Sequence, residues 1–184
     1  MNVGALLVCF LLFAAGERLW ETKLSRIAIR GQKRQGWSLP ALLVLHAAVL
    51  IATGVEYFLR QPAINWLVTG VGLMLFVTSS VVRLVAIRTL GKFWSLHLEI
   101  RKEHQLIREG IYSRVRHPAY SAIMLEMMAV QLVGNSYGTL AFVVCVYIPL
   151  LLVRWQREER EMIEKFGEQY VRYRQEVPAF IPWR

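Results

Sequence analysis

The stretch that decides the fold is LPALLVLHAAVLIATGVEYF, residues 39–58, in which Glu56 is the one charged side chain. A helix needs roughly 20 mostly apolar residues to cross the hydrocarbon core of a bilayer. A second run of this kind, INWLVTGVGLMLFVTSSVV, follows at residues 64–82 and carries no charge. The two runs therefore predict two membrane-spanning helices.

Three further apolar runs lie at residues 3–15, 119–133 and 140–153. The first lacks the basic start and the small-residue cleavage site of a signal peptide, so we interpret it as a helix. The last two runs are short and are separated by GNSYG, residues 134–138, a composition typical of a turn. They predict a helical hairpin whose two ends return to one side. The expected fold is all-α, a polytopic membrane protein with about five transmembrane helices.

The charge balance is basic, with 22 Lys and Arg against 13 Asp and Glu and a formal net charge of +9. A basic balance fits either nucleic acid or an anionic membrane surface. Because 55% of the residues are hydrophobic and gather in long runs, the sequence favours membrane lipids and predicts no nucleic-acid partner. Cations cluster in residues 23–34, 88–116 and 154–184, while the opposite side has Arg60. The positive-inside rule predicts an N-terminus outside and a cytoplasmic C-terminal tail.

The chain is expected to form a single domain over residues 1–184. Residues 1–88 would hold three helices, and residues 89–184 would hold the chemistry. Cys9 and Cys145 both lie in apolar runs and have no CxxC or Cys/His spacing, so neither a disulfide nor a zinc site is predicted.

Two polar segments, residues 90–120 and 154–183, are too long and too patterned to be simple connections. The second begins as an amphipathic helix that Gly167 interrupts. The first contains His97, His104 and His117, whose spacings of seven and thirteen match no short metal motif. We therefore expect no metal site.

Several charged residues at the membrane boundary permit two interpretations. Glu126 lies inside a predicted helix, where a carboxylate must be paired or must face a functional cavity, and both readings stay open. Arg83, at the inner end of the third helix, can snorkel toward the interface. Arg114 and Arg116 would either serve the site or anchor the following helix to anionic lipid.

Two motifs in the second half resemble a known family. GIYSRVRHPAY, residues 110–120, resembles the G-x-Y-x-x-x-R-H-P-x-Y stretch of the isoprenylcysteine carboxyl methyltransferase family. REEREMIEKFGEQYVRYRQEVPAFIP, residues 157–182, resembles that family's closing element, which recurs in membrane phospholipid methyltransferases. The resemblance covers about residues 90–182, and the short chain is most similar to small prokaryotic members.

The resemblance implies methyl transfer from S-adenosylmethionine, with S-adenosylhomocysteine as product, at a cytoplasmic cofactor-binding region of an integral membrane protein. It implies that Arg154 binds the substrate and that Glu158 contacts the cofactor, both as catalytic residues. Glu126 is a second candidate for binding the substrate. The full set of implied cofactor-binding residues is His97, His104, Gln105, Leu106, Ile107, Tyr112, His117, Pro118, Ala119, Tyr120 and Glu158.

Four hypotheses about the acceptor remain open at the level of sequence. The first is the carboxylate of a lipophilic, prenylcysteine-like acceptor, for which Arg154 supplies a cationic clamp. The second is a long-chain alkylresorcinol or alkylpyrone, which needs a base such as Glu126, His97 or His117. The third is the amine of a phospholipid. The fourth belongs to another class, a non-catalytic membrane scaffold or ligand-binding protein.

Overall fold

The computed structural model of the chain describes residues 2–27, 32–33, 37–94, 99–100 and 106–182. Two 3-10 turns, η1 (Gly91–Phe93) and η2 (Gly110–Ser113), lie between the helices α3 (Trp66–Leu90) and α4 (Pro118–Val133). The two-residue strands β1 (Gln32–Lys33) and β2 (Glu99–Ile100) pair antiparallel. The described residues are otherwise largely helical, which confirms the all-α prediction. The helices are α1 (Val3–Ile27), α2 (Ser38–Arg60), α3 (Trp66–Leu90), α4 (Pro118–Val133), α5 (Tyr137–Phe142), the π-helical η3 (Val143–Tyr147), α6 (Ile148–Phe166) and α7 (Glu168–Glu176).

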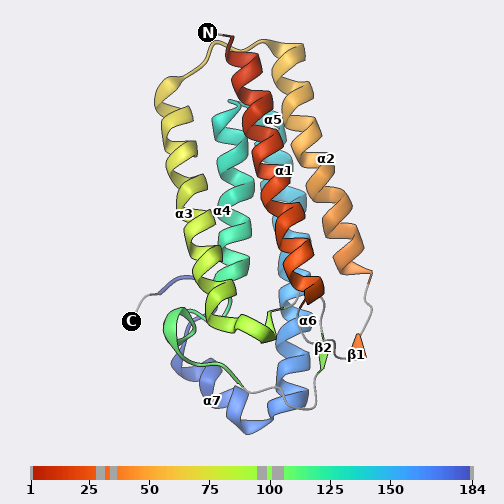
Figure 1. The fold of residues 1–184 in the computed structure, drawn as a ribbon, viewed down its shortest axis with the longest axis vertical. Helices are drawn as coiled ribbons and strands as arrows, with labels where there is room; N and C mark the ends of the chain where they lie inside the picture. Colours follow the sequence, from red (N-terminus) through yellow and green to blue (C-terminus); the bar gives the residue numbers. More distant parts are fainter. Residues whose placement is uncertain (1, 28–31, 34–36, 95–98, 101–105, 183–184) are drawn as a thin grey trace.

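The long helices lie side by side in one bundle, with the N-terminus at one end and α7 at the other (Figure 1). Four stretches are long and apolar enough to cross a membrane, and α4 is a shorter apolar helix. The fourth stretch joins α5, η3 and α6 into one continuous helix that pairs with α4 as the expected hairpin. The prediction of about five membrane helices is confirmed. The four stretches are Val3–Glu21, Ser38–Arg60, Trp66–Leu90 and Tyr137–Phe166.

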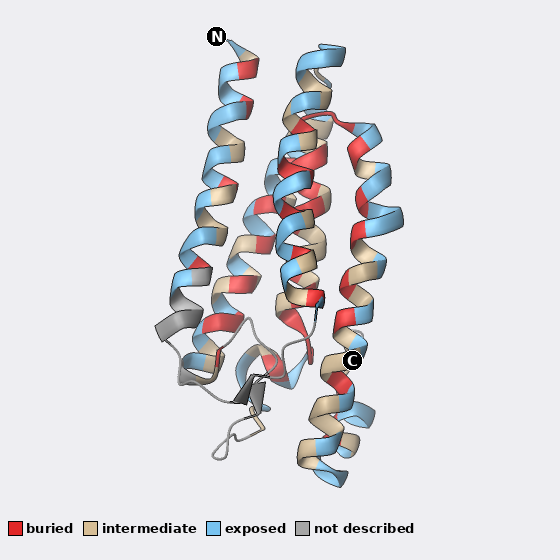
Figure 2. Cartoon of the chain, turned by 90° about the vertical axis from the view of Figure 1, so that its right-hand side faces the viewer, coloured by how far each residue is buried: buried red, intermediate tan, exposed pale blue. Residues whose placement is uncertain are grey.

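The buried residues form stripes that face the interior of the bundle (Figure 2). Many large apolar side chains are exposed on its outward faces. Leu12, Val44 and Leu67 are 68%, 71% and 78% exposed. An apolar surface this extensive would be unfavourable in water and is suited to contact with lipid tails. The distribution of exposed residues therefore agrees with a membrane-embedded bundle.

The helices α3 and α4 form the most extensive contact in the bundle. Gly72 of α3 allows this close approach. A Cβ atom at this position would stand 2.8 Å from the backbone nitrogen of Val133 and 3.0 Å from the carbonyl oxygen of Ala129. Both neighbours are backbone atoms that cannot turn away, so the spacing of α3 and α4 depends on the missing side chain.

Five charged side chains form a buried network between α1, α3 and α4. Arg83 donates to Glu17 at 3.0 Å and also pairs with Glu21 and Glu126, while Arg18 pairs with Glu21 at 2.8 Å and with Glu126. Glu126 is completely buried and Arg83 is 3% exposed. Arg83 therefore does not snorkel to the interface. Its guanidinium stays inside because three carboxylates compensate the loss of water.

The polar end of the bundle is built by the second half of α6 and the segments that follow it. Gly167, with a φ of +53°, separates α6 from α7, as its position in the sequence predicts. After α7 the chain becomes extended at Val177 and returns to the start of α4. This return brings the two motifs of the sequence together at the end of the molecule away from the N-terminus (Figure 1).

Candidate active site

The turn before α4 is held by the returning tail. The backbone N–H groups of Arg116 and His117 donate to the carbonyl oxygens of Pro178 and Ala179, each at 2.9 Å. Because Pro118 occupies the first turn of α4, the two preceding residues lie outside the helix and their N–H groups need other partners. The tail supplies these partners and so fixes the position of the His117 side chain.

Glu159 of α6 is the central acceptor of the site. Its Oε1 atom accepts from His117 Nε2 at 2.6 Å, from the Tyr170 hydroxyl at 2.8 Å and from Arg116 Nε at 3.2 Å. A carboxylate can only accept, so His117 must carry a proton on Nε2. The other ring nitrogen, Nδ1, lies 3.9 Å from Glu158 Oε1. The imidazole therefore stands between two consecutive carboxylates, with its donor directed at Glu159.

Arg116 is an internal residue, only 8% exposed. Besides Glu159, its guanidinium donates to the carbonyl oxygen of Arg174 at 3.0 Å and to that of Val177. These carbonyls belong to the end of α7, where backbone acceptors have no helical partner. The interpretation of Arg116 as a lipid anchor is therefore wrong, whereas Arg114 is exposed.

Glu158 and Arg154 occupy the neighbouring face of α6, one helical turn apart. Glu158 accepts from the Tyr120 hydroxyl at 2.6 Å, and its side chain is 32% exposed. Arg154 is 7% exposed, lies against the same hydroxyl, and donates from Nη1 to Ser38 Oγ at 3.2 Å. A cation and a carboxylate thus flank one phenol at the level where α4 begins.

Aromatic rings surround these polar groups. Trp155 packs on Phe180 with a centroid distance of 4.8 Å and lies 6.2 Å from the ring of His117, which in turn lies 5.6 Å from Tyr120. The indole nitrogen of Trp155 is buried and has no hydrogen-bond partner among the described residues. An unpaired buried donor is unfavourable, so this site is suited to a ligand that brings an acceptor atom.

Three tyrosines close the side of the site next to α7. The Tyr173 hydroxyl donates to the carbonyl oxygen of Tyr112 at 2.5 Å, and burial raises the pKa of Tyr173 to about 12. Burial also raises the pKa of Tyr112, and burial together with the Glu159 charge raises that of Tyr170. All three phenols are therefore neutral donors at physiological pH.

The structure brings together most of the site residues that the sequence analysis proposed. His117, Pro118, Tyr120, Arg154 and Glu158 meet at the start of α4. Leu106 packs on the tyrosines of α7, and Ile107, Ala119 and Tyr112 lie in the same segments. His97, His104 and Gln105 lie outside the described residues. Within the described part of the chain, no three His, Cys, Asp or Glu side chains form a metal-binding group.

Glu126 does not join this group of residues. Its carboxylate is completely buried in the network with Arg18 and Arg83, more than one helical turn further along α4. In the part of the chain that the structure describes, the carboxylate of Glu126 bonds to these two arginines, so a role in binding the acceptor stays a prediction without structural support.

Sequence reasoning missed Glu159, although a signal existed. Glu159 follows Trp155 by four residues and precedes Met162 and Phe166 by three and seven, so it lies on the apolar face of α6. A carboxylate on an apolar face is expected to be buried and bonded. Tyr170 gave no comparable signal, and for Arg116 the sequence left open whether it serves the site or anchors the helix.

Comparison with known proteins gives a consistent result. The model of the isoprenylcysteine carboxyl methyltransferase (ICMT) family matches residues 70–164. Protein-S-isoprenylcysteine O-methyltransferase B of Arabidopsis thaliana is 30% identical over 165 residues, covering 85% of this chain and 83% of that protein. A probable protein-S-isoprenylcysteine O-methyltransferase of Oryza sativa subsp. indica is 29% identical over 121 residues, 64% of this chain and 63% of its own length.

Solved structures that share the fold include that of a membrane methyltransferase. The structure of the eukaryotic intramembrane Ras methyltransferase ICMT matches with a TM-score of 0.57 and 24% identity, over 78% of this chain and 53% of that chain. This chain therefore spans about half the length of that solved protein. The shared fold and the apolar helices identify an integral membrane protein.

Proposed function

The chain belongs to the isoprenylcysteine carboxyl methyltransferase family, and from that premise we propose that it transfers a methyl group from S-adenosylmethionine to the carboxylate of a lipophilic, isoprenylcysteine-like acceptor. One observation carries the proposal furthest. Arg154 and Glu158 lie one turn apart on α6, and both meet the Tyr120 hydroxyl. Arg154, a cation that can bind the carboxylate of the substrate, thus lies beside Glu158, which can accept hydrogen bonds from the cofactor.

The residues fit S-adenosylmethionine by their chemistry. When bound, S-adenosylmethionine supplies an electrophilic methyl group on a sulfonium cation. Glu158, one-third exposed, can accept hydrogen bonds from its ammonium or hydroxyl groups. The unpaired indole N–H of Trp155 can donate to a ring nitrogen or carboxylate, and the rings of His117 and Phe180 offer flat apolar surface.

Arg154 is the proposed anchor of the acceptor carboxylate. A guanidinium can bind a carboxylate through two parallel hydrogen bonds and stays charged at every physiological pH. A carboxylate acceptor has no proton to lose, so this reaction asks no general base of His117 or Glu126. The chain's main contributions are then to hold the acceptor oxygen in place and to exclude water with the rings of Trp155 and Phe180.

The proposed location is an integral membrane protein with its N-terminus outside and this site at the cytoplasmic face. The basis is the distribution of Lys and Arg. At the N-terminal end of the bundle Arg60 is paired with Glu56, whereas clusters of Lys and Arg lie in residues 23–34, 88–116 and 154–184. Positively charged segments are retained on the cytoplasmic side. The expected partners are membrane lipids and a lipophilic acceptor.

Two variants test the assignment of roles. We expect purified wild-type protein to bind S-adenosylhomocysteine with a dissociation constant on the order of micromolar in calorimetry. Glu158→Ala should lose this binding. Arg154→Ala should keep it but lose about 100-fold or more in kcat/KM for an S-prenylated cysteine with a free carboxylate, because one partner of a charge pair is gone. Gln156→Ala, on the exposed face of α6, should change neither value.

A methyl-transfer assay with a radiolabelled methyl donor and a lipid extract distinguishes the carboxylate acceptor from the other three hypotheses. Label found in a long-chain phenol or a phospholipid amine, and never in a carboxyl ester, would overturn the proposed acceptor. Cofactor binding without any labelled product would favour a non-catalytic ligand-binding protein.

A further inference from the structure

The start of α2 is held against α6 by a contact between residues far apart in the sequence. Ser38, the first residue of α2, is completely buried, and its hydroxyl oxygen accepts from Arg154 Nη1 at 3.2 Å. Trp37 occupies the N-cap position, and its side chain caps no backbone N–H of α2. The Ser38 hydroxyl is thus directed across the bundle at the residue proposed to anchor the acceptor.

A second contact locks the same two elements. The guanidinium of Arg157 lies over the Trp37 ring, 4.8 Å from its centroid. Arg154 and Arg157 are three residues apart, so they share one face of α6. Trp37 and Ser38, two consecutive residues at the start of α2, therefore contact two arginines that are one turn apart. This pairing fixes where Ser38 stands relative to α6.

The contact between Ser38 and Arg154 differs in chemistry from the contacts of Arg83, another buried arginine. Arg83 is bonded to three carboxylates, which neutralise its charge. The Ser38 hydroxyl is a neutral partner, so it fixes one edge of the Arg154 guanidinium without placing a negative charge beside it. A long arginine side chain has many rotamers, and a hydrogen bond made before the ligand arrives reduces the entropy lost on binding.

We propose that Ser38 is a positioning residue for methyl transfer, which orients the Arg154 guanidinium toward the acceptor carboxylate. This inference rests on the proposed function of Arg154. The Ser38 hydroxyl contacts Arg154 and, in this arrangement, does not touch the acceptor itself. Its loss should therefore affect the acceptor and not the cofactor, which the neighbouring Glu158 is proposed to bind.

Ser38→Ala tests the inference in the purified full-length protein. We expect the KM for an S-prenylated cysteine carboxylate to rise about tenfold, as for the loss of one hydrogen bond to a charged group. The dissociation constant of S-adenosylhomocysteine should stay within about twofold of wild type. Unchanged cofactor binding also verifies that the variant is folded.

Arg157→Gln is the matched control. It removes the contact of Arg157 with Trp37 and leaves both Ser38 and Arg154 in place, so the acceptor KM should hold within about twofold. An equal rise of KM in Arg157→Gln would show that Ser38→Ala merely loosens α2, and would overturn the inference. A Ser38→Ala variant with a wild-type acceptor KM would overturn it as well.

A double variant separates orientation from local packing. If Ser38 acts through Arg154, adding Ser38→Ala to Arg154→Ala should cause no further change in acceptor KM. Independent, additive effects would contradict the inference. Wild-type protein that methylates no carboxylate acceptor would overturn the proposed function and this inference together, whereas an active wild type with an unaffected Ser38→Ala variant would overturn the inference alone.

Discussion

Glu158 and Glu159 are consecutive residues with opposite environments. Successive side chains on a helix point about 100° apart, so Glu159 enters the bundle while Glu158 stays at its edge. Glu159 already accepts from His117, Tyr170 and Arg116. Glu158 is one-third exposed and is bonded to Tyr120. The buried carboxylate is therefore suited to holding the protein together, and the exposed one is suited to meeting a ligand.

At this scale the tyrosines give a prediction about alkaline stability. Between the ordinary phenol pKa of about 10 and the raised value of about 12, the unfolded chain loses the Tyr173 proton while the folded chain keeps it. The free energy of unfolding should therefore be unaffected by Tyr173 below about pH 10 and should fall as the pH rises through this window. The apparent Tm in detergent micelles, followed with tyrosinate absorbance, measures this change.

The Tyr173→Phe variant is the comparison. It loses the hydrogen bond to the Tyr112 carbonyl, so its Tm at neutral pH should be lower, but its alkaline decline should be shallower. Equal declines in the two proteins would mean that Tyr173 is not the group responsible.

The site residues were predictable mainly through the resemblance of two motifs to a known family. Arg154 and Glu158 were identified from that resemblance, whereas His117 also stood out as an imidazole beside several cations at the edge of a membrane helix. The role of Arg116 stayed open because its sequence neighbours do not include its partners. Those partners, Glu159 and the carbonyls at the end of α7, meet it only through tertiary folding.

Among the elements, α6 joins the membrane to the site. It begins with the apolar residues Ile148 to Val153 and continues without a break into the segment that carries Arg154, Glu158 and Glu159. A single rigid helix therefore sets the depth of these side chains relative to the bilayer. Gly167 then ends it, so that α7 can turn back over the site.

The contact between α3 and α4 gives a prediction at the element scale. Gly72→Ala should destabilise the protein by about 1–3 kcal/mol, because the added methyl meets backbone atoms that cannot move aside. Gly70→Ala, two residues away in the same helix, meets nothing within 4 Å and should be nearly neutral. Thermal unfolding of both variants in the same detergent measures the difference.

Equal stability of the two glycine variants would contradict the close packing of α3 against α4. A loss of stability in Gly70→Ala alone would contradict the assignment of Gly70 to the exposed face.

Helix existence was predictable from the sequence, and helix ends were less so. The first apolar run stops at residue 15, yet α1 continues to Ile27. Glu17, Arg18 and Glu21 look like the polar end of a helix in sequence, but they face Arg83 and Glu126 inside the bundle. A hydropathy scale scores each charged residue as unfavourable in the membrane. It therefore ended the first helix too early, because it does not register that these charges form ion pairs inside the bundle.

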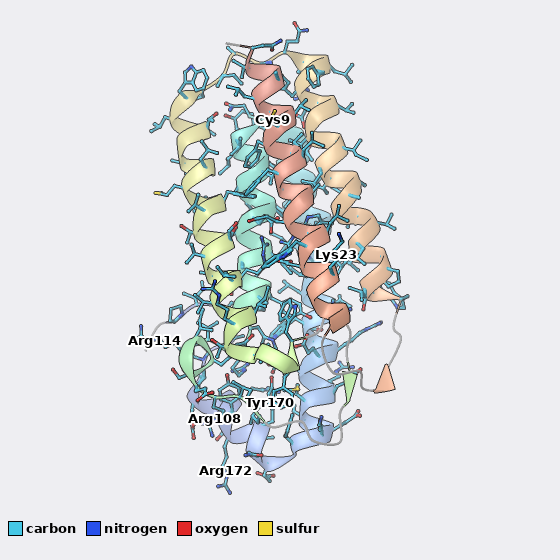
Figure 3. All side chains as sticks on the ribbon, viewed as in Figure 1. Cys9, Lys23, Arg108, Arg114, Tyr170 and Arg172 are labelled. Atoms are coloured by element: carbon cyan, nitrogen blue, oxygen red, sulfur yellow. The ribbon has the colours of Figure 1, made fainter. Side chains whose placement is uncertain are left out.

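The whole molecule is polarised along the bundle axis. The labelled cations Arg108, Arg114 and Arg172 gather at the end away from the N-terminus, whereas Cys9 lies toward the N-terminal end (Figure 3). The proposed orientation in the membrane rests on this polarity and on the positive-inside rule. In that orientation the proposed site would face the side where a soluble cofactor is available.

Orientation can be measured with single cysteines in a variant that carries Cys9→Ala and Cys145→Ala. Ala63→Cys, in the exposed connection between α2 and α3, should react with a membrane-impermeant maleimide in intact cells. Arg172→Cys, on the exposed face of α7, should react after the cells are permeabilised. The reverse pattern of labelling would exclude the proposed orientation.

The tail contacts have a consequence for biosynthesis. The backbone of Arg116 and His117 is completed by Pro178 and Ala179, which a ribosome makes after every helix of the bundle. A nascent chain therefore enters the bilayer before its reaction centre exists. We expect a truncation upstream of Pro178 to give an inserted protein that lacks these backbone bonds and is inactive. Completion of the proposed site would then wait for a stretch that is translated after the helices.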